Sequence, residues 1–155
     1  MSSSIYRKIM VATDGSEHVR KAVDMAIKIA KHSDAKLYAV YVMENDEFSI
    51  PNPKNSELEK TFVNYFRNEG ERATANVENS GKDENIEVES VILEGSPVRE
   101  IVDFAKRTDI DLIVMGTHGK SAIKRFLLGS VTENVVRHSK IAVLVVREKD
   151  INKDK

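Results

Sequence analysis

Short apolar runs alternate along the chain with longer segments in which apolar residues recur every three or four positions. The runs have the length of buried strands, and most are apolar at odd and even positions alike, which is typical of strands covered on both faces. The longer segments predict helices that place one face on a core. The predicted strands are Lys8–Ala12, Lys36–Met43, Glu87–Glu94, Asp111–Met115 and Ile141–Val146.

Four helices are predicted between these strands. Ser16 is a candidate N-cap for the first, and Ser80-Gly81 is expected to end the long second one. Ser96 and Pro97 fit the N-cap and first position of the third, and Ser130-Val-Thr-Glu133 fits a capping box for the last. The inner faces are expected to carry Val19, Ala22, Val23, Ala26, Ile27 and Ala30 in the first helix, Leu58, Phe62, Tyr65, Phe66, Ala73 and Val77 in the second, and Val98, Ile101, Val102 and Ala105 in the third.

The alternation of strands and helices predicts an α/β fold with a mainly parallel sheet and helices on both faces, because parallel neighbours need crossover connections. In such sheets ligands bind beyond the carboxyl ends of the strands, where the strand order reverses. That rule selects two turns, Thr13–Ser16 and Gly116–Ser130. The 155 residues suit a single domain, with an ordered core over 5–147 and frayed termini. The more polar strand Glu87–Glu94 is expected at a sheet edge.

Composition narrows the function classes. Hydrophobic residues make up 41% of the chain, charged residues 32%, and the formal net charge is −1. This balance offers no general attraction for nucleic acid or for an anionic membrane, and no apolar run approaches the ~20 residues of a membrane span. There are no cysteines, so disulfides and thiolate chemistry are excluded. With no signal-peptide pattern at the N-terminus, a soluble cytoplasmic protein is expected.

The segment from Gly116 to Val131 carries the candidate chemistry. It is long for a strand-to-helix connection, contains His118, Lys120, Lys124 and Arg125, and has no acidic residue before Glu133. Its glycines allow close backbone approach, and a helix start at Ser130 would offer free N–H groups to phosphate. The alternative is that the glycines make ordinary turns and the basic side chains are solvated. Gly119-Lys120-Ser121 is not the end of a P-loop, because the first glycine would fall at Val114.

The spacing Gly116-x-x-Gly119, nine residues, then Gly129-Ser130 resembles the G-2x-G-9x-G-[ST] pattern of the ATP-binding branch of the universal stress protein family. Thr13-Asp14-Gly15-Ser16 and Glu94-Gly95-Ser96-Pro97 resemble other turns of that family, and the likeness covers nearly the whole chain. It implies a single-domain, three-layer sandwich with a five-stranded parallel sheet of order 3-2-1-4-5. This fold is Rossmann-like, of the adenine nucleotide alpha hydrolase type.

The resemblance also implies site residues. Gly119, Gly129, Ser130 and Val131 would hold phosphates, while Met115 and Gly116 would line the nucleoside. Ala12, Thr13 and Asp14 would form the opposite wall, with Asp14 near the ribose, and the backbone of Val42 would meet adenine. His118 is a candidate phosphate contact, and an ordinary loop histidine is the alternative. Mg²⁺ or Mn²⁺ would be bound through the phosphates, since no protein metal cluster is visible in the sequence. Many family members have proline at the position of Ala12.

Two kinds of function remain. One is an ATP-dependent binding module in a stress response, with a downstream protein partner. The other is an ATPase or phosphotransferase, for which Asp14, His118 and Glu133 are the candidate groups, although their spacing matches no catalytic motif. The sequence favours binding with slow hydrolysis at most. Loss of nucleotide binding is a third reading, and the intact glycines oppose it.

The last predicted strand bears on partners. Ile141–Val146 is apolar on both faces and would be an exposed edge in the implied strand order. An apolar edge strand needs a cover, and pairing with its symmetry mate in a homodimer supplies one. The family resemblance implies the same dimer. Coverage by the charged C-terminal tail is the alternative.

Overall fold

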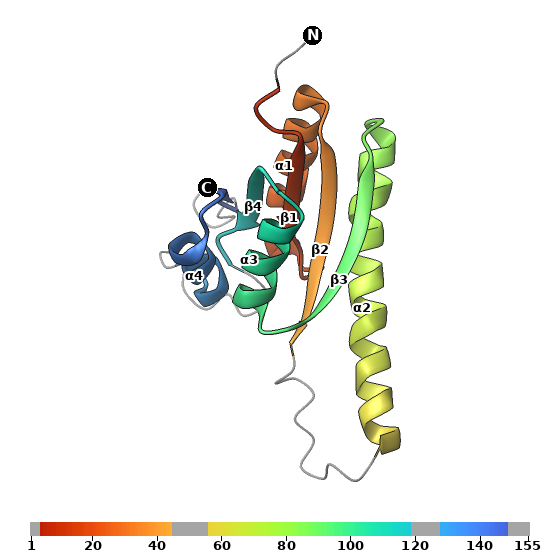
Figure 1. Ribbon diagram of the computed structural model, residues 1–155. Coiled ribbons are helices and arrows are strands. Elements are labelled where there is room, and N and C mark those ends of the chain that lie inside the picture. The colour runs from red at the N-terminus through yellow and green to blue at the C-terminus, as the bar shows by residue number, and fades with distance from the viewer. Residues whose placement is uncertain (1–3, 45–55, 119–127, 149–155) are drawn as a thin grey trace, which may run out of the picture.

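The computed structural model describes residues 4–44, 56–118 and 128–148. Its five strands form one parallel sheet of order β3-β2-β1-β4-β5 (Figure 1), which confirms the predicted order and the α/β class. The strands are β1 (Lys8–Ala12), β2 (Lys36–Glu44), β3 (Val88–Gly95), β4 (Leu112–Gly116) and β5 (Ala142–Val146). The helices are η1 (Glu17–Val19, a 3-10 turn), α1 (Arg20–Ser33), α2 (Ser56–Asp83), α3 (Pro97–Arg107) and α4 (Ser130–His138).

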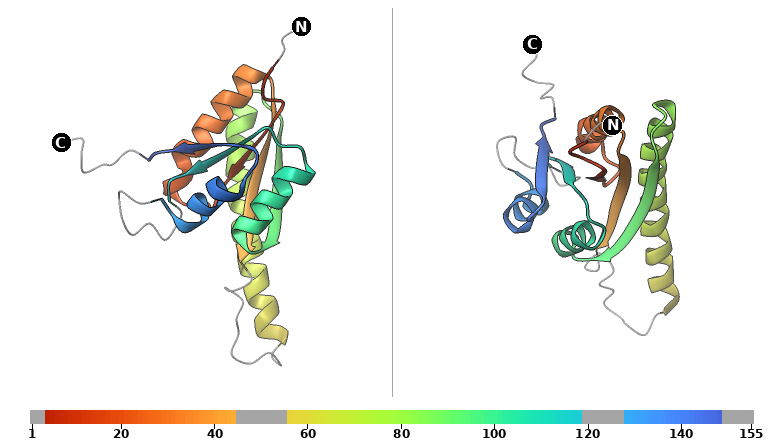
Figure 2. Two further views of the ribbon diagram at one scale, coloured as in Figure 1. Left: turned by 60° about the vertical axis from the view of Figure 1, so that its left-hand side comes forward. Right: turned by 45° about the horizontal axis from the view of Figure 1, so that its top comes forward.

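The helices cover the sheet on both faces (Figure 2), with α1 and α2 on one side and α3 and α4 on the other. The strands β1, β2 and β3 are added one after another toward one edge of the sheet, and β4 then pairs with the other side of β1. Because crossovers between parallel strands are right-handed, this reversal moves the following helices to the opposite face. The strand order therefore reverses between β1 and β4.

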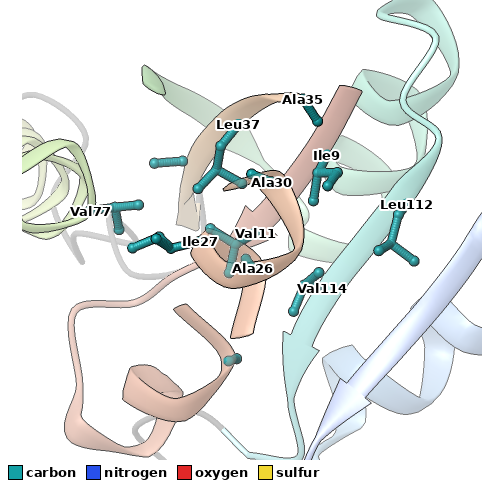
Figure 3. Packing of buried hydrophobic residues seen from close by; sticks show 12 residues of the cluster. Ile9, Val11, Ala26, Ile27, Ala30, Ala35, Leu37, Val77, Leu112 and Val114 are labelled. Atoms are coloured by element: carbon teal, nitrogen blue, oxygen red, sulfur yellow. The ribbon is translucent and has the colours of Figure 1, made fainter. Parts of the chain in front are cut away.

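Two clusters of buried side chains hold the layers together. The first lies between the sheet and α1 (Figure 3), where Ile9 and Val11 of β1 meet Ala26 and Ala30 of α1. The second lies under α3 and α4, where Met10 and Val40 meet Phe104 and Val135. Ile9, Met10 and Val11 are all fully buried, so β1 is covered on both faces, as its uninterrupted apolar run predicts.

The predicted end of α2 is wrong. The helix runs through Ser80-Gly81 to Asp83, and the chain then turns at Asn85, whose φ is 59°. Asparagine tolerates this left-handed conformation, which commonly ends helices. Gly81 has a packing role instead, because a Cβ there would collide with Cγ2 of Val88 in β3.

The first half of α2 also differs from prediction. Leu58, Phe62 and Tyr65 are 40%, 40% and 57% exposed, whereas the buried face of the helix begins at Gly70 and continues through Ala73 and Val77. Figure 1 gives the reason: the N-terminal turns of α2 extend past the carboxyl edge of the sheet, whereas Val63 and Phe66 already pack against Tyr41 and Met43 of β2. The inner face predicted for the helix is therefore correct from Phe66 onward and wrong at Leu58, Phe62 and Tyr65. No helix within the described residues is long and apolar enough to cross a membrane.

The two serines predicted as N-caps do stand at helix starts, but Ser16 does so at a different helix from the one predicted. Ser16 caps the 3-10 turn η1 rather than α1, and Ser96 caps α3 with Pro97 at its first position. Neither serine makes a side-chain capping hydrogen bond. Ile101 and Ala105 of α3 are buried as predicted, and Phe104 joins them.

Candidate functional site

The candidate site lies where β1 and β4 end, at the reversal of strand order. Val11 pairs with Val114 in the sheet, so the next residues, Ala12 and Met115, reach the same edge. The chain then leaves β1 toward α1 on one face and leaves β4 toward α4 on the other. This divergence is the arrangement that opens a ligand crevice in parallel α/β sheets.

The turn after β1 is fixed by its own polar groups. Thr13 is buried, and its N–H donates to the carbonyl of Val40 in β2 at 2.8 Å. Thr13 Oγ1 accepts from the Gly15 N–H at 3.1 Å, and Asp14 Oδ1 accepts from the Ser16 N–H at 2.9 Å. The Asp14 carboxylate therefore shapes the turn at the edge of the crevice. Ser16 Oγ is buried and has no hydrogen-bond partner in the described part of the chain.

Gly15 makes this turn possible. Its φ of +78° lies in the region that glycine adopts without strain. A Cβ at this position would also stand 3.1 Å from Cβ of Ala73, so the turn packs directly against the middle of α2.

The end of β4 is enclosed by backbone. A Cβ added to Gly116 would lie 3.2 Å from the carbonyl oxygen of His18 and 3.5 Å from that of His118. Gly116 is thus a glycine because two chain segments pass close to it. His18 belongs to η1, and its Nδ1 pairs with Glu148 Oε2 at 2.8 Å, which links this turn to the chain that follows β5.

The first turn of α4 is tied to β4 by two hydrogen bonds. The Gly129 N–H donates to the carbonyl of Thr117 at 2.7 Å, and Thr132 Oγ1 donates to the carbonyl of Gly116 at 2.8 Å. The first intrahelical bond runs from Glu133 N to Gly129 O at 2.9 Å. The amides of Ser130, Val131 and Thr132 precede that bond, so they are the free N–H groups of a helix N-terminus.

The predicted capping box is wrong. Gly129 is the N-cap of α4, and Ser130 is already the first helical residue. Glu133 does not reach back to the cap, because its Oε1 pairs with Arg137 one turn further on, at 3.0 Å. The shift by one residue follows from the bond between Gly129 and Thr117, which fixes the glycine at the helix entrance.

His118 is the second residue after the end of β4. Its Nδ1 lies 3.1 Å from Thr117 Oγ1, and its Nε2 is buried with no hydrogen-bond partner in the described part of the chain. Gly119, the remaining predicted phosphate contact, lies outside the described residues, as do Lys120, Lys124 and Arg125.

An apolar wall completes the geometry. Met115 is buried in the cluster under α3 and α4, and Ala12, Val42 and Val131 pack against that cluster. These four residues come from β4, β1, β2 and α4, and the fold brings them to the same face of the sheet. The wall and the free amides of α4 share one residue, Val131, so an apolar surface adjoins a helix N-terminus.

Four residues near this site are not among the predicted site residues, although Ser16 and Thr117 lie in the two turns that the sequence selects. Thr117, Thr132, Ser16 and Val19 all lie against the groups described above. Thr132 left a detectable signal: it stands three residues before Val135 on the inner face of the last helix, where a polar side chain needs a partner. The other three depend on chain segments that meet only in the folded protein.

The fold and the crevice define an open, doubly wound α/β protein. A family model described as the universal stress protein family matches residues 5–147, and the chain belongs to that family. It is 39% identical over 146 residues to universal stress protein MJ0531 of Methanocaldococcus jannaschii, covering 94% of this chain and 84% of that one.

Solved structures agree with this assignment. The structure of protein MJ0577, from the same archaeon, superposes with a TM-score of 0.84 at 32% identity, covering 94% of this chain and 99% of that one. A universal stress protein solved in complex with cAMP has a TM-score of 0.66 at 31% identity, with 92% and 97% covered. A member of the family with this fold therefore binds an adenine nucleotide.

Proposed function

We propose that this chain is an ATP-binding universal stress protein, a nucleotide-dependent binding module of a stress response with slow ATP hydrolysis at most. The observation that carries the proposal is the free N-terminus of α4, which two hydrogen bonds hold against the end of β4 where the strand order reverses.

The phosphates belong at α4. The amides of Ser130 and Val131 lie at the positive end of the helix dipole, and Gly129 presents no side chain in front of them. The nearest acidic side chain of the helix, Glu133, is engaged by Arg137, so its charge is partly balanced. Gly119 would add further contacts, as would His118 through its Nε2, for which the described residues 4–44, 56–118 and 128–148 offer no partner.

The nucleoside belongs along the apolar wall. Met115 and Gly116 would face it from β4, and Ala12 and Thr13 from β1, with Asp14 at the ribose hydroxyls. The backbone of Val42, on the wall beyond β1, would meet the adenine ring. Apolar walls with a few fixed polar groups are the usual build of such sites.

A divalent cation would be held through the phosphates. Among the described residues no group of three His, Asp or Glu side chains is arranged to hold a metal ion. One carboxylate oxygen of Asp14 accepts a hydrogen bond from the Ser16 amide, so this side chain would contact a metal ion through a metal-bound water at most. Mg²⁺ commonly binds in this way, with waters and phosphate oxygens as its main ligands.

The engagement of the candidate catalytic groups favours binding over turnover. Asp14 and Glu133 already accept bonds from Ser16 and Arg137. His118 keeps Nε2 buried and without a partner among the described residues, which is the feature that favours the alternative, an ATPase or phosphotransferase in the same pocket. A phosphate release assay on the wild type and His118→Ala separates the two: robust release that the variant loses would establish the enzyme.

We further place the protein in the cytoplasm, as a homodimer through 141–146 that acts on a downstream protein. The absence of cysteine fits a reducing compartment, and the apolar edge strand fits a dimer.

The test of ATP binding starts from freshly purified protein. Mass analysis of released nucleotide should find ATP, and calorimetry on the emptied protein should give a measurable Kd for ATP. Gly129→Val should weaken that Kd by at least about 100-fold, since a side chain then enters the phosphate position and presses on Thr117.

The control is Val136→Ala, which changes an exposed side chain of the same helix, and it should bind as the wild type does. Wild-type affinity in the Gly129 variant would refute the assigned phosphate position.

A further inference from the structure

Thr132 is one of three polar residues that are buried in the described part of the chain, together with Thr13 and Thr74. It is 5% exposed and lies in the first turn of α4. Its hydroxyl donates to the carbonyl of Gly116, the last residue of β4, at 2.8 Å. The bond therefore joins the two elements that frame the candidate site.

We propose that Thr132 is a positioning residue for nucleotide binding: its hydroxyl locks the N-terminus of α4 onto the end of β4 and so sets where the phosphate-binding amides stand. The inference rests on the proposed function, and it assigns a role to a residue that need not touch the nucleotide.

The geometry shows which element would move if the bond were lost. The end of β4 cannot shift easily, because β4 is buried along its whole length and Met115 and Gly116 pair with Val145 and Val146 of β5. The first turn of α4 is held by the Gly129–Thr117 backbone bond and by Thr132. Without the hydroxyl, the Gly129–Thr117 bond would be the one remaining of these two, and the first turn could shift about it while Val135 keeps the rest of the helix packed.

The bond also has an electrostatic effect. The Gly116 carbonyl carries partial negative charge at the end of β4, beside the free amides of α4. The Thr132 hydroxyl engages this oxygen and keeps it directed at the helix. An unengaged carbonyl at this place would repel the phosphates that the amides attract.

A purely structural role is the competing explanation, since any buried hydroxyl needs a partner. Thr74 provides the comparison. It is 1% exposed, and its Oγ1 donates to the Gly70 carbonyl at 3.0 Å within α2. Removing either hydroxyl costs a buried bond from a threonine to a carbonyl, but only Thr132 joins α4 to β4.

The experiment compares Thr132→Val, Thr132→Ser and Thr74→Val with the wild type, using ATP and calorimetry well below each midpoint of unfolding. Valine keeps the shape of threonine without the donor, and serine keeps the donor. Thr132→Val should weaken the Kd by about tenfold, while Thr132→Ser and Thr74→Val should stay within about twofold of wild type. Equal weakening by Thr74→Val, or no rescue by serine, would overturn the positioning role.

A second measurement needs no ligand. Hydrogen exchange in the nucleotide-free protein should show the Gly129 and Glu133 amides losing protection in Thr132→Val and keeping it in Thr132→Ser, because both amides report closure of the first turn. Unchanged protection in Thr132→Val would refute the lock whether or not ATP binds. A wild type that binds no ATP would instead refute the proposed function.

Discussion

Gly81 lies within α2, two residues before the helix ends, and faces β3. Helix propensity and packing make opposite demands there. Glycine inside a helix costs about 1 kcal/mol relative to alanine. A Cβ, however, would collide with Cγ2 of Val88 and stand 3.1 Å from Cγ1 of Ile86. Val88 is β-branched and stiff, so the neighbour cannot yield cheaply.

Gly81→Ala should therefore destabilise the protein, by about 1–3 kcal/mol, although propensity alone predicts a gain. Denaturant unfolding measures the change. The double variant Gly81→Ala/Val88→Ala removes the colliding methyl group and should be less destabilised than the sum of the two single changes. A stabilised single variant would mean that β3 adapts at little cost.

Gly129 and Ser130 show how far the start of a helix can be predicted from local sequence. Their pattern correctly predicts a helix start, which the structure has at Ser130 with Gly129 as its N-cap. The pattern fits two registers, however, with either Gly129 or Ser130 as the cap. The register is chosen by bonds to Thr117 and Gly116, residues more than ten positions away, and no local pattern reports them.

Among the elements, α2 deviates most from prediction. Its apolar spacing predicts a helix, and the helix is there. Periodicity also predicts that Phe62 and Val77 share a face, but it does not tell how far the sheet extends beneath that face. Because the sheet ends first, Val77 is buried and Phe62 is exposed. The inner strands pose no such difficulty, since the apolar runs of β2, β1 and β4 lie between neighbouring strands.

This division predicts two stabilities within one helix. Amides in the first turns of α2, up to Phe62, should exchange with solvent through local opening, while those from Ala73 to Gly81 should exchange only when larger parts of the protein unfold. The physical reason is that α2 packs on the sheet from Val63 and Phe66 onward, whereas Leu58 and Phe62 before them are exposed. Hydrogen exchange followed by NMR distinguishes the two parts. Uniform protection along α2 would mean that something covers its first turns in solution.

For the whole molecule, the sequence predicts the class, the number of strands and, through the family resemblance, their order. The two sheet edges follow as β3 and β5, of which β3 is the more polar. The structure of a single chain does not determine what pairs with the exposed edge of β5. Glu148 reaches His18, so the start of the tail runs toward η1. Two copies paired along β5 would satisfy the free backbone groups of that edge.

Val145→Lys tests the proposed dimer. Val145 is partly exposed on β5 and belongs to neither cluster that flanks the sheet. A charge there should therefore weaken the association of two copies more than it lowers the stability of the fold. Light scattering after gel filtration should give a dimer for the wild type and a monomer for the variant. Val136→Lys, on the outer surface of α4, is the control and should remain dimeric. A dimeric Val145 variant would place the interface elsewhere.

The contact of Gly15 with Ala73 couples the turn after β1 to α2. Toward its N-terminus the helix stays on the sheet as far as Val63, which packs with Phe66 against Tyr41 and Met43 of β2. Only the seven residues from Ser56 to Phe62 extend beyond that contact, over about 10 Å at ~1.5 Å per residue. A ligand that displaced the turn after β1 would therefore press on a helix that β2 braces over its middle, and the exposed side chains of Leu58 and Phe62 are where the displacement would meet least resistance.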